Sequence, residues 1–161
     1  RHNTGFMVLD AFAKASNICF EDKRYGYVAE TSIKGRKVFL LKPTTFMNLS
    51  GNAVRYWLNK ENIDQQRLLV VSDDVALPLG EFRLKASGSN GGHNGLGHII
   101  QLIGQDFPRG GQVDWVLGHY SDEDMKLLQP AIDMSVEIIK SFVLQGIGNT
   151  MNQFNKLGKR K

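Results

Sequence analysis

A glycine-rich run at residues 88–95 is the stretch of this sequence best suited to chemistry. It reads Gly-Ser-Asn-Gly-Gly-His-Asn-Gly and stands immediately before an apolar segment. Glycines allow positive φ angles and let a ligand approach the backbone closely. His93 and Asn94 add hydrogen-bond donors and acceptors that a flexible linker does not need. The run therefore predicts a site, with a Gly/Ser linker or simple turn formation as the alternatives.

Other segments carry side chains suited to acid–base work or to holding a carbonyl group. His2 precedes a helical pattern, and its imidazole titrates near neutral pH, so it is a candidate general base; an exposed loop histidine is the alternative. Asp73 and Asp74 follow an apolar run, where a carboxylate can orient an imidazole or cap a turn. Asn48 can hold a carbonyl or cap the helix expected after it. Lys85, taken alone, could simply be the exposed end of a strand.

Helices and strands in mixed order must position these groups. Apolar residues at helical spacing predict helices, and alternating or continuous β-branched runs predict strands. The expected helices are 6–13, 50–58, 96–103 and 122–144. The expected strands are 25–31 and 36–43, joined as a hairpin by Lys34-Gly35, followed by 67–74, 82–85 and 113–117.

The fold class follows from this order of elements. The run at 67–74 has the continuous apolar character of a strand buried on both faces, as in a parallel sheet, and its end should open into a crevice. Helices and strands mix along the chain, which favours an α/β domain. We expect a single domain over residues 1–161, with a mixed, mostly parallel twisted sheet flanked by helices.

Composition limits the class of protein and its partners. The 161 residues are 42% hydrophobic and 22% charged, which suits one globular domain with a sizeable core. The net charge of +4 favours an acidic partner such as nucleic acid. Cys19 is the only cysteine, so the chain cannot form an internal disulfide or a thiolate zinc cluster, and we expect a reducing, cytoplasmic setting. No apolar run approaches the roughly 20 residues of a membrane span.

Four motifs in combination resemble the bacterial peptidyl-tRNA hydrolase family. They are Arg-His-Asn-x-Gly at 1–5, Lys-Pro-x-Thr-Phe-Met-Asn-x-Ser-Gly at 42–51, Asp-Asp-x-x-Leu-Pro-x-Gly at 73–80 and Gly-Gly-His-Asn-Gly-Leu at 91–96. The likeness covers essentially the whole chain and includes the closing motif at 151–155. It implies cleavage of the ester that joins a peptide to the 3′ ribose of tRNA, without a metal or cofactor. The implied partner is peptidyl-tRNA, and we expect a monomer that makes no membrane contact.

The resemblance also implies roles for residues at matching positions. His2 would be the general base that takes a proton from the attacking water, and Asp73 would orient His2 and stabilise its imidazolium. Asn48 and Asn94 would hold the peptide carbonyls and the water. Lys85 would grip the 5′-terminal phosphate of the tRNA. The remaining substrate-binding residues would be Phe46, Met47 and His93.

Two departures from the family pattern concern whole strands. Members of the family begin with a strand that runs into a Gly-x-Gly-Asn-Pro-Gly turn, and this sequence starts after that turn. They also carry a strand with a basic residue after the helix that follows the glycine loop, whereas here Gly104 leads directly into 105–108. We therefore expect that these segments of a longer protein are absent from the sequence. Without the second strand, Lys85 lacks its partner in the phosphate clamp.

Two other functions compete with hydrolysis. A hydrolase-like RNA-binding module would use the basic surface without a catalytic base, but the joint presence of His2, Asp73, Asn48 and Asn94 argues against it. A nucleotide-binding enzyme would rest on the glycine loop alone. Its glycines match neither the Gly-x-Gly-x-x-Gly pattern nor a phosphate-binding loop with its Lys-Ser/Thr ending, which disfavours this class.

Overall fold

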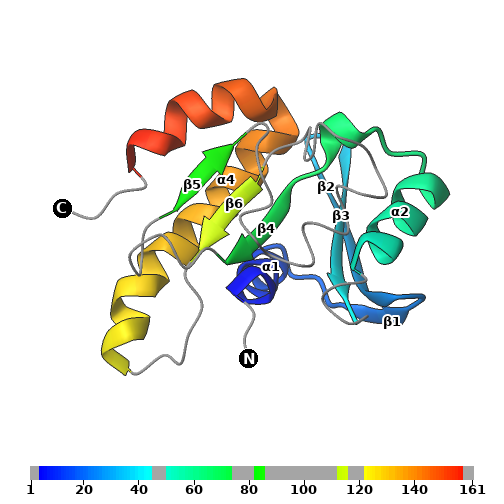
Figure 1. The fold of residues 1–161 in the computed structure, drawn as a ribbon, viewed down its shortest axis with the longest axis horizontal. Helices are drawn as coiled ribbons and strands as arrows, with labels where there is room; N and C mark the ends of the chain where they lie inside the picture. The colour runs from blue at the N-terminus through cyan, green and yellow to red at the C-terminus, as the bar shows by residue number, and fades with distance from the viewer. Residues whose placement is uncertain (1–3, 45–49, 74–81, 86–111, 116–121, 158–161) are drawn as a thin grey trace.

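The computed structural model describes residues 4–44, 50–73, 82–85, 112–115 and 122–157 (Figure 1). Its helices are α1 (Thr4–Ala15), α2 (Ser50–Lys60) and α4 (Asp122–Phe154), with short 3-10 turns η2 (Gln65–Arg67) and η3 (Asn155–Leu157). Its strands are β1 (Glu21–Lys23), β2 (Gly26–Ile33), β3 (Arg36–Pro43), β4 (Val70–Asp73), β5 (Arg83–Lys85) and β6 (Gln112–Trp115). The expected helix at 96–103 lies outside the described residues.

β1, β2 and β3 form an antiparallel sheet whose central feature is the predicted hairpin. β2 and β3 pair along their whole length, from Gly26 opposite Pro43 to Ile33 opposite Arg36. The turn between them is Lys34-Gly35, with φ angles of 48° and 82°. Two positive φ angles suit the two-residue hairpin turn that matches the natural twist of the strands. The hairpin and its turn are confirmed.

β4, β6 and β5 form a second sheet, in that order. β4 and β6 run parallel, with Val70 opposite Gln112 and Asp73 opposite Trp115, whereas β5 runs antiparallel to β6. The mixed character of the predicted sheet is confirmed. In the part of the chain that the structure describes, however, parallel pairing is confined to β4 and β6. Strands joined by a two-residue turn, such as β2 and β3, must run antiparallel.

The start of β4 corrects one boundary. The apolar run predicted a strand from residue 67, but β4 begins at Val70. Residues 65–67 form the turn η2 instead, because Asp64 Oδ1 accepts a hydrogen bond from the Gln66 amide at 2.9 Å. An aspartate that bonds the backbone two residues ahead favours a turn over an extended chain. The predicted pairing of this strand in a parallel sheet is confirmed.

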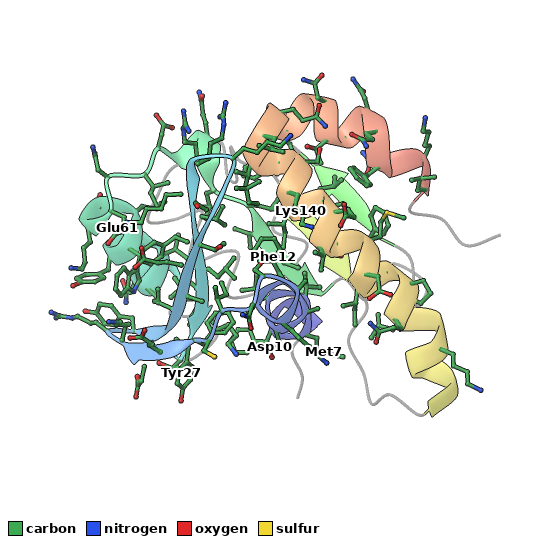
Figure 2. All side chains as sticks on the ribbon, turned by 180° about the vertical axis from the view of Figure 1, so that it is seen from behind. Met7, Asp10, Phe12, Tyr27, Glu61 and Lys140 are labelled. Carbon is green, nitrogen blue, oxygen red and sulfur yellow. The ribbon has the colours of Figure 1, made fainter. Side chains whose placement is uncertain are left out.

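One hydrophobic core joins both sheets to α1 and α4. Phe12 projects from α1 into this core (Figure 2) and is fully buried, as are Leu84 on β5 and Leu128 and Ile138 on α4. α4 crosses behind the β4-β6-β5 sheet (Figure 1). Val71 of β4 contacts this main core, as does Leu69 just before the strand, whereas Val70 of β4 and the preceding Leu68 contact a smaller cluster built on Val54 and Leu58 of α2. β4 is therefore packed on both faces, as its continuous apolar run predicted.

α4 consists of two helices separated at Gly146, where φ is 80° and ψ is 177°. Glycine adopts such a positive φ without the steric cost that a side chain would bring. The predicted helix end at Leu144 lies just before this break. Beyond it, the buried Thr150 hydroxyl donates to the Gly146 carbonyl at 2.7 Å and lies 2.8 Å from the Ser141 hydroxyl. These contacts fasten the second helical segment to the first.

Candidate functional site

The structure describes the backbone, but not the side chains, of two predicted site residues. Asp73 is the last residue of β4 and Lys85 is the last residue of β5. The other predicted residues lie outside the described part of the chain: His2, Phe46, Met47, Asn48, His93 and Asn94. The contact between His2 and Asp73 therefore stays a prediction.

Asp73 and Lys85 lie at opposite ends of the second sheet. Asp73 pairs with Trp115 at the end of β6, and Lys85 pairs with Gln112 at its start. At about 3.3 Å per residue and about 4.8 Å between strands, the two backbones are separated by about 10 Å along β6 and about 10 Å across the sheet. Their diagonal separation is therefore about 14 Å.

The described elements next to His2, Asn48 and Asp73 in the sequence meet at α1. The carboxyl end of β4, which carries Asp73, lies beside α1 (Figure 1). α1 begins at Thr4, two residues after His2. β3 ends at Pro43, shortly before Asn48, and Lys42 Nζ on this strand lies 2.6 Å from Asp10 Oδ1 on α1. The described elements thus bring together the neighbours of three of the four motifs.

β5 is held at its outer edge by a side chain from the closing motif. The Leu84 amide donates to Asn155 Oδ1 at 2.8 Å, and Asn155 Nδ2 donates to the Leu84 carbonyl at 3.2 Å. The Asn155 amide thus satisfies both backbone groups of Leu84, as a neighbouring strand would do. Because Leu84 directly precedes Lys85, this double hydrogen bond also sets the position of the backbone that carries Lys85.

A cavity of about 950 Å³ separates the facing edges of β3 and β4. It touches every residue of 36–41 on one side and of 66–71 on the other. Successive side chains of a strand point to opposite faces, so a cavity in contact with all of them must follow the strand edge. Val54 and Leu58 of α2 line one face, and Phe142 of α4 is also in the lining. The cavity is therefore a slot between the two sheets, with apolar side chains of α2 and α4 in its lining beside polar ones such as Glu61 and Arg67.

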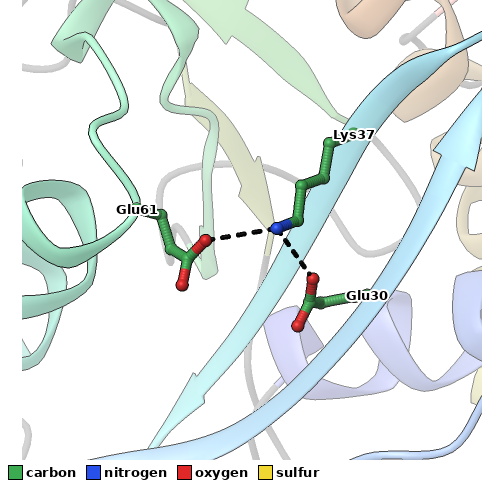
Figure 3. A network of polar contacts seen from close by, with 3 residues as sticks. All are labelled: Glu30, Lys37 and Glu61. Atoms are coloured by element: carbon green, nitrogen blue, oxygen red, sulfur yellow. Dashed lines mark hydrogen bonds and ion pairs between the residues drawn. The ribbon is translucent and has the colours of Figure 1, made fainter.

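The clearest charge network of the described residues joins β2, β3 and the end of α2. Lys37 Nζ lies 3.1 Å from Glu30 Oε1 on β2 and 3.3 Å from Glu61 Oε1, just beyond α2 (Figure 3). Hydrogen bonds to Glu30 first, and then to Glu61, raise the pKa of the Lys37 ammonium. This exposed network ties the hairpin to α2 and holds no group in a position for the proposed chemistry.

Within the described ranges, no cluster of three or more His, Cys, Asp or Glu side chains is arranged to bind a metal ion. None of the helices there is both long and apolar enough to span a membrane.

Comparison with known proteins identifies the family. A profile of the family described as peptidyl-tRNA hydrolase matches residues 1–161. The chain belongs to the peptidyl-tRNA hydrolase family. A peptidyl-tRNA hydrolase of Phocaeicola vulgatus is 57% identical over 168 residues, which cover 97% of this chain and 90% of that protein. One from Porphyromonas gingivalis is 46% identical over 167 residues, with 96% and 90% covered.

Solved structures of the same family share this fold. The crystal structure of peptidyl-tRNA hydrolase from Acinetobacter baumannii at 1.00 Å has a TM-score of 0.84 and 30% identity, and the match covers 96% of this chain and 86% of that one. The complex of a peptidyl-tRNA hydrolase with N-propanol has a TM-score of 0.86 at the same identity and coverage. The expected α/β class of the peptidyl-tRNA hydrolase family is confirmed.

Sequence reasoning gave no role to three residues that organise this region: Asp10, Lys42 and Asn155. Lys42 and Asn155 stand inside quoted motifs, but motif membership does not reveal a partner. Lys42 pairs with Asp10 across 32 positions, and Asn155 bonds Leu84 across 71. For Lys42 the sequence did hold a signal: alternation along β3 places it on the same face as the buried Leu40, which indicates a lysine turned toward the protein interior.

Proposed function

We propose that this chain hydrolyses the ester bond of peptidyl-tRNA, releasing the peptide and free tRNA. The match to the peptidyl-tRNA hydrolase family over all 161 residues carries the proposal. The peptidyl-tRNA hydrolase of Phocaeicola vulgatus is 57% identical to this chain, and the match covers 90% of that protein. The RNA-binding module and the nucleotide-binding enzyme are not favoured by any of these comparisons.

In the proposed mechanism His2 is the general base. It accepts a proton as water attacks the ester carbonyl, the bond to the 3′ oxygen breaks, and the proton passes to that leaving oxygen. Asp73 orients the imidazole and stabilises it while it is charged. Acid–base help of this kind contributes roughly 10²- to 10⁴-fold. The convergence of α1 and the end of β4 supports this pairing.

Neutral amides and a separate cation complete the proposed site. Asn48 and Asn94 align the carbonyl groups and the water, and they stay uncharged across the working pH range. Phe46, Met47 and His93 line the same cleft. Lys85 binds the 5′-terminal phosphate of the tRNA, a contact that does not depend on base sequence. Its separation of about 14 Å from Asp73 supports two subsites, one for the ester and one for the phosphate.

We further propose that the enzyme acts as a cytoplasmic monomer with peptidyl-tRNA as its partner. The net charge of +4 suits a nucleic-acid substrate. Cys19 is free and exposed, as suits a reducing compartment.

The expectation of an additional strand in this single domain also stays a proposal, and the slot between β3 and β4 supports it. One extended segment there would pair with both edges, join the two sheets and be apolar on both faces, because the slot is lined by apolar side chains from α2 and α4. Intact-mass measurement tests this proposal. A folded sample of 18.0 kDa without a bound peptide would refute it.

Incubation with an N-blocked aminoacyl-tRNA tests the proposed activity. The wild-type chain should release free tRNA, and His2→Ala should lose at least about 100-fold in rate while its affinity for tRNA is retained. Binding of tRNA without release by the wild type would instead indicate an RNA-binding module. Affinity for a nucleotide without affinity for tRNA would indicate the third class.

A further inference from the structure

Lys42, next to the last residue of β3, is enclosed by aromatic rings and paired with a carboxylate of α1. Its Nζ lies 2.6 Å from Asp10 Oδ1. The same atom lies 4.1 Å from the centroid of the Phe20 ring, 5.8 Å from that of Phe6 and 5.9 Å from that of Tyr27. Asp10 and Tyr27 lie at the same end of the molecule (Figure 2).

The burial of Lys42 sets it apart from other ion-paired lysines in the described ranges. Its side chain is 16% exposed, whereas those of Lys23, Lys37 and Lys140 are 48%, 62% and 44% exposed. An ammonium group removed from water needs a counter-charge and is further stabilised over ring faces. Lys42 is therefore the least exposed of these lysines, and its ammonium lies between the Asp10 carboxylate and the rings.

The backbone around Lys42 is fixed as firmly as its side chain. Gly26 of β2 packs so closely that a Cβ atom there would lie 2.5 Å from the Lys42 carbonyl oxygen. Just beyond β3, the Thr44 amide donates to the Tyr25 carbonyl at 3.0 Å. The end of β3 is thus attached to β2 through its backbone and to α1 through Lys42.

The two elements joined by this ion pair are those that lead directly into proposed site residues. α1 starts two residues after His2, and Asp10 lies in the middle of that helix. Lys42 precedes Phe46, Met47 and Asn48 by four to six residues. The ion pair therefore links the element that follows the proposed base to the strand that precedes the proposed carbonyl-binding amide.

We propose that Lys42 is a positioning residue for ester hydrolysis. Through Asp10 it fixes the separation between α1 and the end of β3, and so the placement of His2 relative to Asn48. This inference rests on the proposed function. A shift of about 1 Å between reacting groups can cost about 100-fold in rate, so loss of the ion pair acts on kcat. The tRNA-phosphate subsite at Lys85 lies at the far end of the second sheet, so KM is little affected.

Lys42→Met is the main test, because methionine keeps an unbranched stem among the rings and removes the charge. We expect kcat for an N-blocked aminoacyl-tRNA to fall about tenfold or more with KM within about twofold. Lys42→Arg restores the charge and should recover part of kcat, since guanidinium groups pair with carboxylates and stack on rings. An unchanged kcat in Lys42→Met, or a change in KM alone, would overturn the proposal.

Lys37→Met is the matched control. Lys37 lies near the start of the same strand, is ion-paired with two glutamates and lies 5.8 Å from the Phe39 ring centroid. Its replacement should leave kcat within about twofold of the wild type, because it contacts neither α1 nor the end of β3. Equal losses of kcat in the two variants would show that removing any β3 lysine has the same effect, and would overturn a specific role for Lys42.

A second readout separates this inference from the proposed function. In NMR spectra, Lys42→Met should shift the resonances of the His2 ring and of the Asn48 side-chain amide, and Lys37→Met should not. A wild type without hydrolase activity would refute the function, and these spectra would still decide the positioning role. Unshifted His2 and Asn48 resonances would overturn that role. If Lys42→Met does not fold, Asp10→Asn removes the same ion pair from its exposed side, and the same outcomes apply.

Discussion

The double hydrogen bond between Asn155 and Leu84 predicts a large stability loss on removal of one side chain. Leu84 is 1% exposed, so Asn155→Ala leaves its amide and carbonyl without their partner. An unsatisfied buried group costs about 1–3 kcal/mol. Because Asn155 is only partly buried, water replaces part of the loss, and we expect a net destabilisation of about 2 kcal/mol for the variant.

Urea unfolding followed by tryptophan fluorescence measures this effect. With a slope of about 2 kcal/mol per molar, the midpoint of Asn155→Ala should fall by roughly 1 M with the slope unchanged. Asn155→Asp keeps the acceptor for the Leu84 amide but sets a carboxylate oxygen against the Leu84 carbonyl in place of the donor, so its midpoint should also fall below that of the wild type.

Asn149→Ala is the matched control for this series. Asn149 is exposed and donates to the Gln145 carbonyl at 3.3 Å, so its loss should change stability by less than about 0.5 kcal/mol. The reasoning is refuted if Asn155→Ala lowers the midpoint by no more than Asn149→Ala does. It is also refuted if Asn155→Asp is as stable as the wild type, because the donor to the Leu84 carbonyl would then contribute nothing.

Three further predictions concern packing, pH and tRNA binding. Gly26→Ala should destabilise the protein by about 2 kcal/mol, because its new methyl group meets the Lys42 carbonyl. Gly148 of α4 has open space around it, so Gly148→Ala should stabilise the protein by about 0.5–1 kcal/mol. Thermal unfolding checks both. Folding raises the pKa of Lys37, so the contribution of its ion pairs is fully present below about pH 10 and is lost as the pH rises through the raised pKa. Unfolding midpoints measured from pH 8 to 11 should therefore decline less steeply in Lys37→Met. Lys85→Ala should weaken tRNA binding and lower the slope of log K against log salt by about 1, as a salt titration would show.

Several elements could be predicted because their signals are local. The hairpin follows from alternation on either side of a Lys-Gly pair, and α1 and α2 follow from apolar residues at helical spacing. The boundary of β4 was misplaced by three residues because the competing turn depends on the single side chain of Asp64. β1 was missed, since Glu21–Lys23 is short, charged and exposed at every position and carries no apolar pattern.

The candidate site could be predicted as a set of residue types but not as an arrangement. Four motifs far apart in the sequence indicated the peptidyl-tRNA hydrolase family, and the family match supports that interpretation. The motifs gave no sign that Lys42 binds Asp10 or that Asn155 completes the edge of β5. Each of these contacts depends on two elements that meet only after the core has formed.

The sequence by itself determined the family, the helical and hairpin segments and the chemical identity of the proposed catalytic groups, because periodicity, turn residues and motif spacing are written in neighbouring positions. Tertiary structure alone decided that β4 lies beside β6, that Asp73 and Lys85 stand at opposite ends of one sheet, and that the ammonium of Lys42 is enclosed between α1 and the hairpin. The physical reason is that apolar burial draws distant segments together without regard to their order. Geometry, and with it the placement of charge, is fixed only when those segments pack.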